Sequence, residues 1–156
     1  MSALEVTDKL IDVLKDKEKD YDFILVNYAN PDMVGHTGDI GAAVTALEIT
    51  DKCLDRLITT VIEQNGCLLI TADHGNVEEM TNLRTGERDT EHSTNPVPCW
   101  YITATNHRDE ALEEIKNHPI EGMLVDLTPT ILELMEIPKG PEMSGQSLLE
   151  ILNVNR

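Results

Sequence analysis

Apolar residues recur along the first half of the chain with two different periods. Helical spacing over residues 6–14 predicts a helix, and the apolar run at 22–27 predicts a short buried strand. Residues 28–39 carry Pro31, Gly35 and Gly38, which predicts a loop. The clearest helix is predicted over residues 40–64, where apolar side chains hold one face and Asn65-Gly66 follows as a stop signal.

The second half of the chain continues with shorter apolar runs. Strands are predicted at 67–72 and 97–103, separated by a long polar loop. Residues 122–135 have a helical pattern, with Pro129 suited to the first turn of the helix. The order strand, helix, strand, strand, helix predicts an α/β domain with a largely parallel sheet. Three or four strands are few for such a sheet, so Met1 is expected to stand within a larger domain.

The composition disfavours some classes of partner and indicates a cellular compartment. The 156 residues fit one domain, and their net charge of -17 disfavours nucleic acid or an anionic membrane surface as a partner. No apolar stretch approaches the ~20 residues of a membrane helix, and the first residues do not resemble a signal peptide. A cytoplasmic protein is therefore expected.

The cysteine pattern is typical of a protein in a reducing compartment such as the cytoplasm. Cys53, Cys67 and Cys99 are odd in number, far apart in sequence and without a CxxC pair, which favours free thiols over disulfides or a zinc site. Cys53 falls in the long helical pattern and Cys67 opens a strand, so both are predicted to be buried and inert.

Aspartate and histidine are concentrated in three loops. Asp32 and His36 follow the first predicted strand, Asp73 and His74 follow the second, and His92 precedes the third. Ligands of open α/β sheets bind beyond the carboxyl ends of the strands, so the first two loops are expected to converge at one edge. Two carboxylates and three imidazoles suit manganese, zinc or iron, and the absence of a thiolate disfavours a structural zinc site.

Each of these features is weak when taken alone. An aspartate four residues before a histidine is more often a surface pair, and a single histidine is more often a hydrogen-bonded structural residue. Together the five side chains exceed what one ion with an open position needs, and two ions ~3.5 to 4 Å apart would suit phosphoryl transfer. Asn76 and Glu78 receive no role, since support of the ligands and plain solvation are equally compatible with their position. His107 and His118 are predicted to be surface residues.

Four longer stretches carry a family resemblance. They are NPDMVGHTG at 30–38, TADHGN at 71–76, HSTNPVP at 92–98 and GQSL at 145–148. The chain resembles, over nearly its whole length, the carboxyl-terminal part of cofactor-independent phosphoglycerate mutases. The first stretch is the distinctive one, because TADHG is shared more widely among alkaline-phosphatase-like enzymes, including phosphopentomutases.

The resemblance implies an alkaline-phosphatase-like three-layer α/β/α domain, of which residues 1–156 are only a part. It implies two divalent ions, with manganese as the first choice and zinc, cobalt or iron as alternatives. Asp32, His36 and His92 would bind one ion. Asp73 and His74 would bind the other, together with an aspartate and a serine from an amino-terminal segment.

The same resemblance implies an activity and places its nucleophile outside this chain. Members of the family interconvert 3-phosphoglycerate and 2-phosphoglycerate in glycolysis and gluconeogenesis through a phosphoserine, are expected to be monomeric, and grip the glycerate with arginines of an inserted domain. The nucleophilic serine and that domain have no counterpart in residues 1–156, so no catalytic residue is assigned here and little mutase activity is expected. Two alternatives stay open: a phosphopentomutase or phosphohydrolase of the same superfamily, and a non-catalytic metal-binding module.

Overall fold

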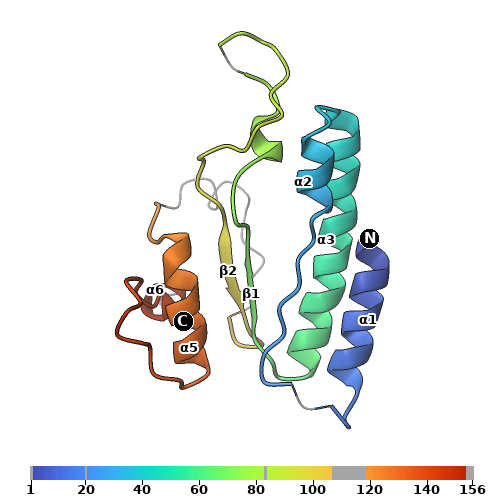
Figure 1. Cartoon of the computed structure of the whole chain (residues 1–156). Helices are drawn as coiled ribbons and strands as arrows, with labels where there is room; N and C mark the ends of the chain where they lie inside the picture. The colour runs from blue at the N-terminus through green and yellow to red at the C-terminus, as the bar shows by residue number, and fades with distance from the viewer. Residues whose placement is uncertain (1, 20, 83, 107–118, 154–156) are drawn as a thin grey trace.

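A two-stranded sheet stands between two groups of helices (Figure 1). The computed structural model describes residues 2–19, 21–82, 84–106 and 119–153. Strand β1 (Leu68–Thr71) pairs antiparallel with β2 (Cys99–Ile102). The helices on one side are α1 (Ala3–Lys15), α2 (Asn30–Gly35) and α3 (Ile40–Glu63), and those on the other are α5 (Leu127–Leu134) and α6 (Leu149–Asn153).

The packing of α1 against α3 forms the best-buried part of the described chain. Both helices were predicted by their apolar spacing, and both predictions are confirmed. Cys53 and Leu57 of α3 are fully buried, and so is Thr7 of α1. The Thr7 side chain contacts Tyr28, which lies far from it in sequence. The Thr7 hydroxyl donates to Ala3 O at 2.8 Å and shares a 2.6 Å hydrogen bond with the Tyr28 hydroxyl, which fixes the segment leading to α2 against α1.

Both ends of α3 have clear local causes. Asp39 caps the helix by accepting a 3.0 Å hydrogen bond from Ala42 N. At the other end Asn65 adopts a left-handed φ of 55°, and Gly66 N donates to Val61 O at 2.9 Å. Asn65 N also donates to Ile62 O, so the two bonds form the Schellman pattern that closes a helix. The predicted stop at Asn65-Gly66 is thus confirmed.

The predicted loop at 28–39 is wrong in part, because residues Asn30–Gly35 form the short helix α2. Pro31 lies in its first turn, where a missing N–H costs nothing and the fixed φ favours helix. The helix predicted over 122–135 is confirmed with different bounds: a 3-10 turn, η2 (Leu124–Asp126), leads into α5, which contains Pro129 in its first turn.

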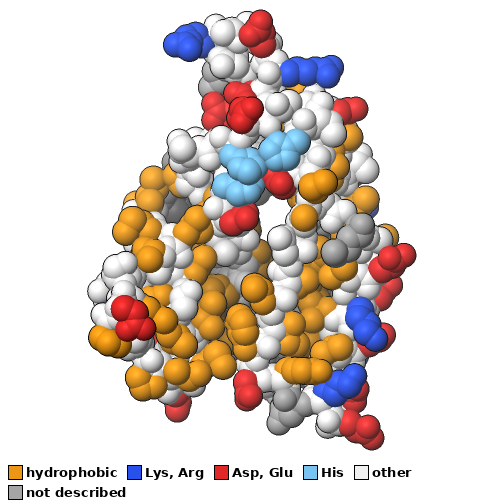
Figure 2. Space-filling model, viewed as in Figure 1, with side chains coloured by type: hydrophobic (Ala, Val, Ile, Leu, Met, Phe, Trp, Pro, Cys, Tyr) orange, Lys and Arg blue, Asp and Glu red, His pale blue; other side chains and the backbone are white. Residues whose placement is uncertain are grey.

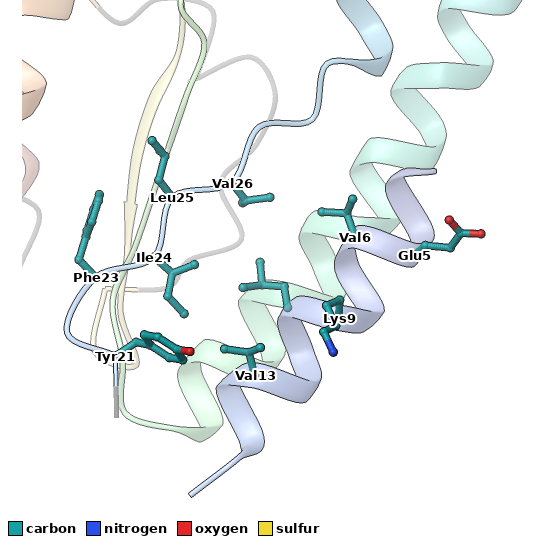
Figure 3. A pocket seen from close by; sticks show the side chains of 10 residues that line it. Glu5, Val6, Lys9, Val13, Tyr21, Phe23, Ile24, Leu25 and Val26 are labelled. Carbon is teal, nitrogen blue, oxygen red and sulfur yellow. The ribbon is translucent and has the colours of Figure 1, made fainter. Parts of the chain in front are cut away.

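The run at 22–27, predicted as a buried strand, is not part of a sheet in the described chain. It is extended, but no backbone hydrogen bond joins it to another described residue. Figure 3 shows Ile24 and Val26 turned toward α1, whereas Phe23 and Leu25 point away from it. This is the alternation of a strand with apolar residues on both faces, yet Leu25 is 84% exposed. The segment and α1 together line a groove of ≈ 580 Å³.

The largely parallel sheet is likewise not found among the described residues, where the paired strands are antiparallel. The reason lies in the connection. Parallel neighbours usually need a crossover through a helix, whereas the described part of the connection between β1 and β2 folds back on itself and contains just the short 3-10 helix η1 (Val77–Glu79). The 22–27 run is joined to β1 through the full helix α3, but it pairs with no strand among the described residues.

The chain leaves much of its apolar surface open. Its accessible surface is 11276 Å², against about 7,900 Å² expected for a compact monomer of this mass. Figure 2 shows hydrophobic side chains spread over the lower part of the visible face. Cys67 is also exposed, so its predicted burial is wrong: it lies between the Schellman turn and β1, outside the core. Cys53 is buried as predicted, and all three thiols are free.

Two further predictions from the sequence concern membrane helices and the surface position of two histidines. None of the helices within the described residues is long and apolar enough to cross a bilayer. His107 and His118, predicted at the surface, lie outside the described residues.

Substituting Leu57 by Ala should destabilise the chain by about 2–5 kcal/mol, because it removes a fully buried side chain of α3. Leu47 of the same helix is 44% exposed, so Leu47→Ala should cost less than ~1 kcal/mol and serves as the matched control. Urea denaturation followed by circular dichroism measures both. Equal losses in the two variants would contradict the described packing of α3.

Candidate metal centre

Asp32 and His36 are brought together by helix α2. Asp32 lies in its first turn and His36 is its C-cap, so the two side chains are one turn apart on the same face. The backbone bond from His36 N to Asp32 O, 3.2 Å long, maintains that turn. His36 Nε2 is 3.3 Å from Asp32 Oδ1.

Asp73, His74 and His92 are brought together by the antiparallel strands. Thr71, the last residue of β1, pairs with Cys99, the first of β2, so the loops that carry the three residues leave the same end of the sheet. An isolated bridge between Gly75 and Ser93 continues the pairing, with Ser93 N donating to Gly75 O at 2.9 Å. As a result the rings of His74 and His92 stack with centroids 3.6 Å apart.

Three donor atoms from two of the loops face a common point. His92 Nε2 lies 3.1 Å from His36 Nε2 and 3.3 Å from Asp32 Oδ1. The third side of the triangle is the 3.3 Å between His36 Nε2 and Asp32 Oδ1. Figure 2 shows the histidines as one cluster on the surface with acidic side chains at its margin.

The dimensions of this triangle match those around a transition-metal ion. Donors about 2.1 Å from an ion lie roughly 3.0 Å apart in octahedral and roughly 3.4 Å apart in tetrahedral coordination. The measured separations of 3.1 and 3.3 Å fall between these values. Two imidazole nitrogens and one carboxylate oxygen are also a suitable donor set for such an ion. The residues present therefore fit a divalent metal.

Backbone carbonyls set the tautomers of two histidines. His36 Nδ1 lies 2.7 Å from Thr90 O, and His74 Nδ1 lies 3.3 Å from Gly75 O. A carbonyl oxygen only accepts hydrogen bonds, so each Nδ1 carries the proton in these contacts. In a neutral ring this tautomer leaves Nε2 as the acceptor, which is the arrangement that a metal-binding imidazole needs.

The second pair of residues is more open than the first set. Asp73 Oδ1 is 3.5 Å from His74 Nε2, and the Asp73 side chain is 83% exposed. Asp32, His74 and His92 also have donor atoms within 4.8 Å of one another. The five sequence-derived residues are therefore adjacent, but their geometry alone does not divide them into the two sets that the family resemblance implies.

Asn76 and Glu78, to which the sequence assigned no role, are part of the site. Asn76 is buried and its Nδ2 donates to Asp32 Oδ1 at 2.8 Å. The Glu78 carboxylate accepts hydrogen bonds from Ser93 Oγ, from Asn95 Nδ2 at 3.1 Å and from Asn76 N at 2.7 Å. Their place directly after Asp-His-Gly was the one sequence signal available, and it does not distinguish support from solvation.

The surroundings of Glu78 favour its ionised form. Partial burial by itself raises the pKa of the carboxyl, but the hydrogen bonds from Ser93, from its own backbone N–H, from Asn95 and from Asn76 outweigh that effect. The pKa of Glu78 is consequently lower than its usual value.

Comparison with known proteins places the chain in a family. Residues 1–139 match the profile of the family described as "Metalloenzyme superfamily". The chain is 49% identical over 149 residues to the 2,3-bisphosphoglycerate-independent phosphoglycerate mutase of Acetivibrio thermocellus, and 49% identical over 150 residues to that of Clostridium novyi. These alignments cover 96% of the chain but only 27% and 28% of the relatives.

A solved structure is also similar to this chain over most of the chain's length. The crystal structure of Leishmania mexicana phosphoglycerate mutase at low cobalt concentration superposes with a TM-score of 0.73 and 27% sequence identity. The match covers 92% of this chain and 27% of that one. The chain thus spans about a quarter of the length of the relatives it matches.

Close packing around Asn76 gives a test of this geometry. A Cβ added at Gly35 would lie 2.0 Å from Asn76 Oδ1, so Gly35→Ala must displace a buried side chain, and we expect a loss of about 1–3 kcal/mol. At Gly41 in α3 the nearest atom to such a Cβ is Asp39 Oδ1, at an ordinary contact distance of 3.5 Å, so Gly41→Ala should be stabilising by about 0.5–1 kcal/mol. Chemical denaturation distinguishes the opposite signs. A harmless Gly35→Ala would mean that Asn76 is not held as described.

Proposed function

Because this chain belongs to the Metalloenzyme superfamily, we propose that its Asp–His cluster is part of the metal centre of a phosphoglycerate mutase that works without bisphosphoglycerate. The observation that carries the proposal is the triangle of donors from Asp32, His36 and His92, with sides of 3.1 and 3.3 Å. Identity of 45–49% to proteins of that name over nearly the whole chain supports the same reaction.

We divide the five residues into two ligand sets according to how exposed their side chains are. Asp32, His36 and His92 form the compact set and would hold one manganese ion. Asp73 and His74 would hold a second, and the 83% exposure of Asp73 leaves room for ligands from elsewhere in a longer protein. When bound, the ions supply Lewis acidity for phosphoryl transfer between the 2- and 3-hydroxyls of glycerate. Zinc, cobalt and iron are alternatives, and the related Leishmania structure was determined with cobalt.

The chain's own residues prepare the site for an anionic substrate in two ways. The Nδ1 atoms of His36 and His74 donate to backbone carbonyls, which orients each ring so that its Nε2 is directed to the centre. Divalent ions held there would reverse the local sign of a chain whose net charge is -17. An anionic phosphoglycerate would thereby be attracted to a protein that otherwise repels it.

The open surface supports the proposal that this chain forms part of an alkaline-phosphatase-like three-layer domain with a largely parallel sheet. The 22–27 run is extended, apolar on both faces and joined to β1 through α3, which is the connection that parallel neighbours use. Completing the sheet along this run would cover Phe23 and Leu25. The nucleophilic serine and the substrate-gripping arginines would be supplied by the same larger protein, which we propose to be cytoplasmic.

Titration with Mn²⁺ tests the metal centre. We expect one tight site in the chain, weakened in His36→Ala and His92→Ala by more than the roughly 10–100-fold typical of residues that only support a ligand. His118→Ala, outside every matched motif, is the control and should bind as the unaltered chain does. Calorimetry gives affinity and stoichiometry together. Absence of binding by the unaltered chain, or unchanged binding in both cluster variants, would contradict the proposal.

The chain by itself should show little or no mutase activity, because no residue in it is assigned as the phosphate acceptor. A coupled assay that converts 3-phosphoglycerate to 2-phosphoglycerate, with Mn²⁺ present, measures this. A near-normal rate would refute the expectation. In a longer protein that contains this sequence, a preference for pentose phosphates over phosphoglycerate would instead favour a phosphopentomutase.

A further inference from the structure

Asn76 is a buried side chain whose amide touches the donor triangle. It is 6% exposed, and its Nδ2 donates to Asp32 Oδ1, the oxygen that also faces His36 and His92. The absence of a Cβ at Gly35 is what allows this approach, since such an atom would lie 2.0 Å from Asn76 Oδ1. This closely packed hydrogen bond joins helix α2 to the loop of Asp73 and His74.

Glu78 makes the corresponding connection to the His92 loop. Its Oε2 accepts from Asn76 N, while its Oε1 accepts from Ser93 Oγ and from Asn95 Nδ2. Ser93 is the neighbour of His92 in sequence, and its own N–H is bonded to Gly75 O. A Cβ at Gly75 would lie 2.2 Å from Ser93 Oγ, which shows how closely the two loops approach.

We propose that Asn76 and Glu78 act as positioning residues, which hold the three ligand-bearing segments in place before any ion binds. Asn76 fixes the Asp32 carboxylate of α2, and Glu78 fixes the loop of His92, so both act from the loop of Asp73 and His74. The proposal rests on the metal centre proposed above and adds to it the cause of its preorganisation.

The alternative role for Glu78, as a ligand itself, is disfavoured by its partners. Both carboxylate oxygens already accept hydrogen bonds from protein groups. Asn76 offers its Nδ2, a donor, to Asp32, and a donor of that kind does not bind a cation. Removing either side chain would leave the ligands themselves in the protein but free their orientation, which typically costs 10–100-fold in metal affinity.

The test is a Mn²⁺ titration of Asn76→Ala, Glu78→Ala and Glu78→Gln, with thermal unfolding of each variant measured in a chelator. We expect affinities about 10–100-fold weaker for both alanine variants. Glu78→Gln keeps an acceptor for Ser93 and Asn95 but presents an amide N–H₂ to Asn76 N, so its affinity should lie between that of the unaltered chain and that of Glu78→Ala.

Two matched controls separate positioning from general stability and charge. Asn106→Ala removes an amide that bonds Tyr101 O and Thr103 away from the cluster, so it should lower thermal stability without changing Mn²⁺ affinity. Glu79→Ala removes the adjacent carboxylate, which within the described residues accepts a 2.9 Å hydrogen bond from the same Asn95, and should change affinity less than threefold.

The outcomes distinguish this inference from the metal centre on which it rests. No Mn²⁺ binding by the unaltered chain would overturn both. Normal binding by the unaltered chain and by Asn76→Ala and Glu78→Ala would overturn the positioning role alone. Equal losses in Glu78→Ala and Glu79→Ala would assign the effect to lost negative charge, and a loss in Asn106→Ala would assign it to lost stability; either result would overturn the inference.

Discussion

The Asp32 carboxylate is the point at which the site is assembled. Its Oδ1 accepts from Asn76 and faces the Nε2 atoms of His36 and His92, so it is shared by a helix and two loops that are far apart in sequence. Keeping one amide donor and two imidazole nitrogens around this carboxylate requires that α2 and both loops hold their positions. Much of the local structure serves that requirement: Pro31 in the first turn of α2, glycine at 35 and 75, and the Gly75–Ser93 bridge.

The Asp32 carboxylate is closely surrounded by polar groups, whereas much apolar surface elsewhere in the chain is exposed. Helices α1 and α3 bury a small core, yet the chain exposes 11276 Å² and leaves Phe23, Leu25 and Trp100 largely uncovered. Among the described residues the 22–27 run is extended but pairs with no strand. Hydrophobic burial, which stabilises most domains, is therefore incomplete here, whereas Asp32, Asn76 and Glu78 have hydrogen-bond partners within the chain. Such a chain is expected to gain stability from further apolar contacts.

The charges in and around the Asp–His cluster determine which ions it attracts. With a net charge of -17, the chain repels phosphate at long range. The cluster gathers three imidazoles whose Nε2 atoms are turned inward, and neutral imidazoles with carboxylates attract cations rather than anions. Under the function proposed above, attraction of a phosphorylated substrate would be a property of the protein together with its ions, which His36, His74 and His92 would help to hold.

The sequence by itself determined α1, α3 and α5 and named the candidate metal ligands. The bounds of α1 and α3 follow from apolar spacing and local caps such as Asp39 and Asn65, because such signals act within a few residues. Asp32, His36, Asp73, His74 and His92 were found because their motifs are contiguous. Only the tertiary structure decided that β1 and β2 are antiparallel, that Cys67 is exposed, and that Asn76 and Glu78 join three segments. Strand pairing and buried hydrogen bonds depend on partners 15 to 44 positions away, and no local pattern in a single sequence records which partner a side chain will meet.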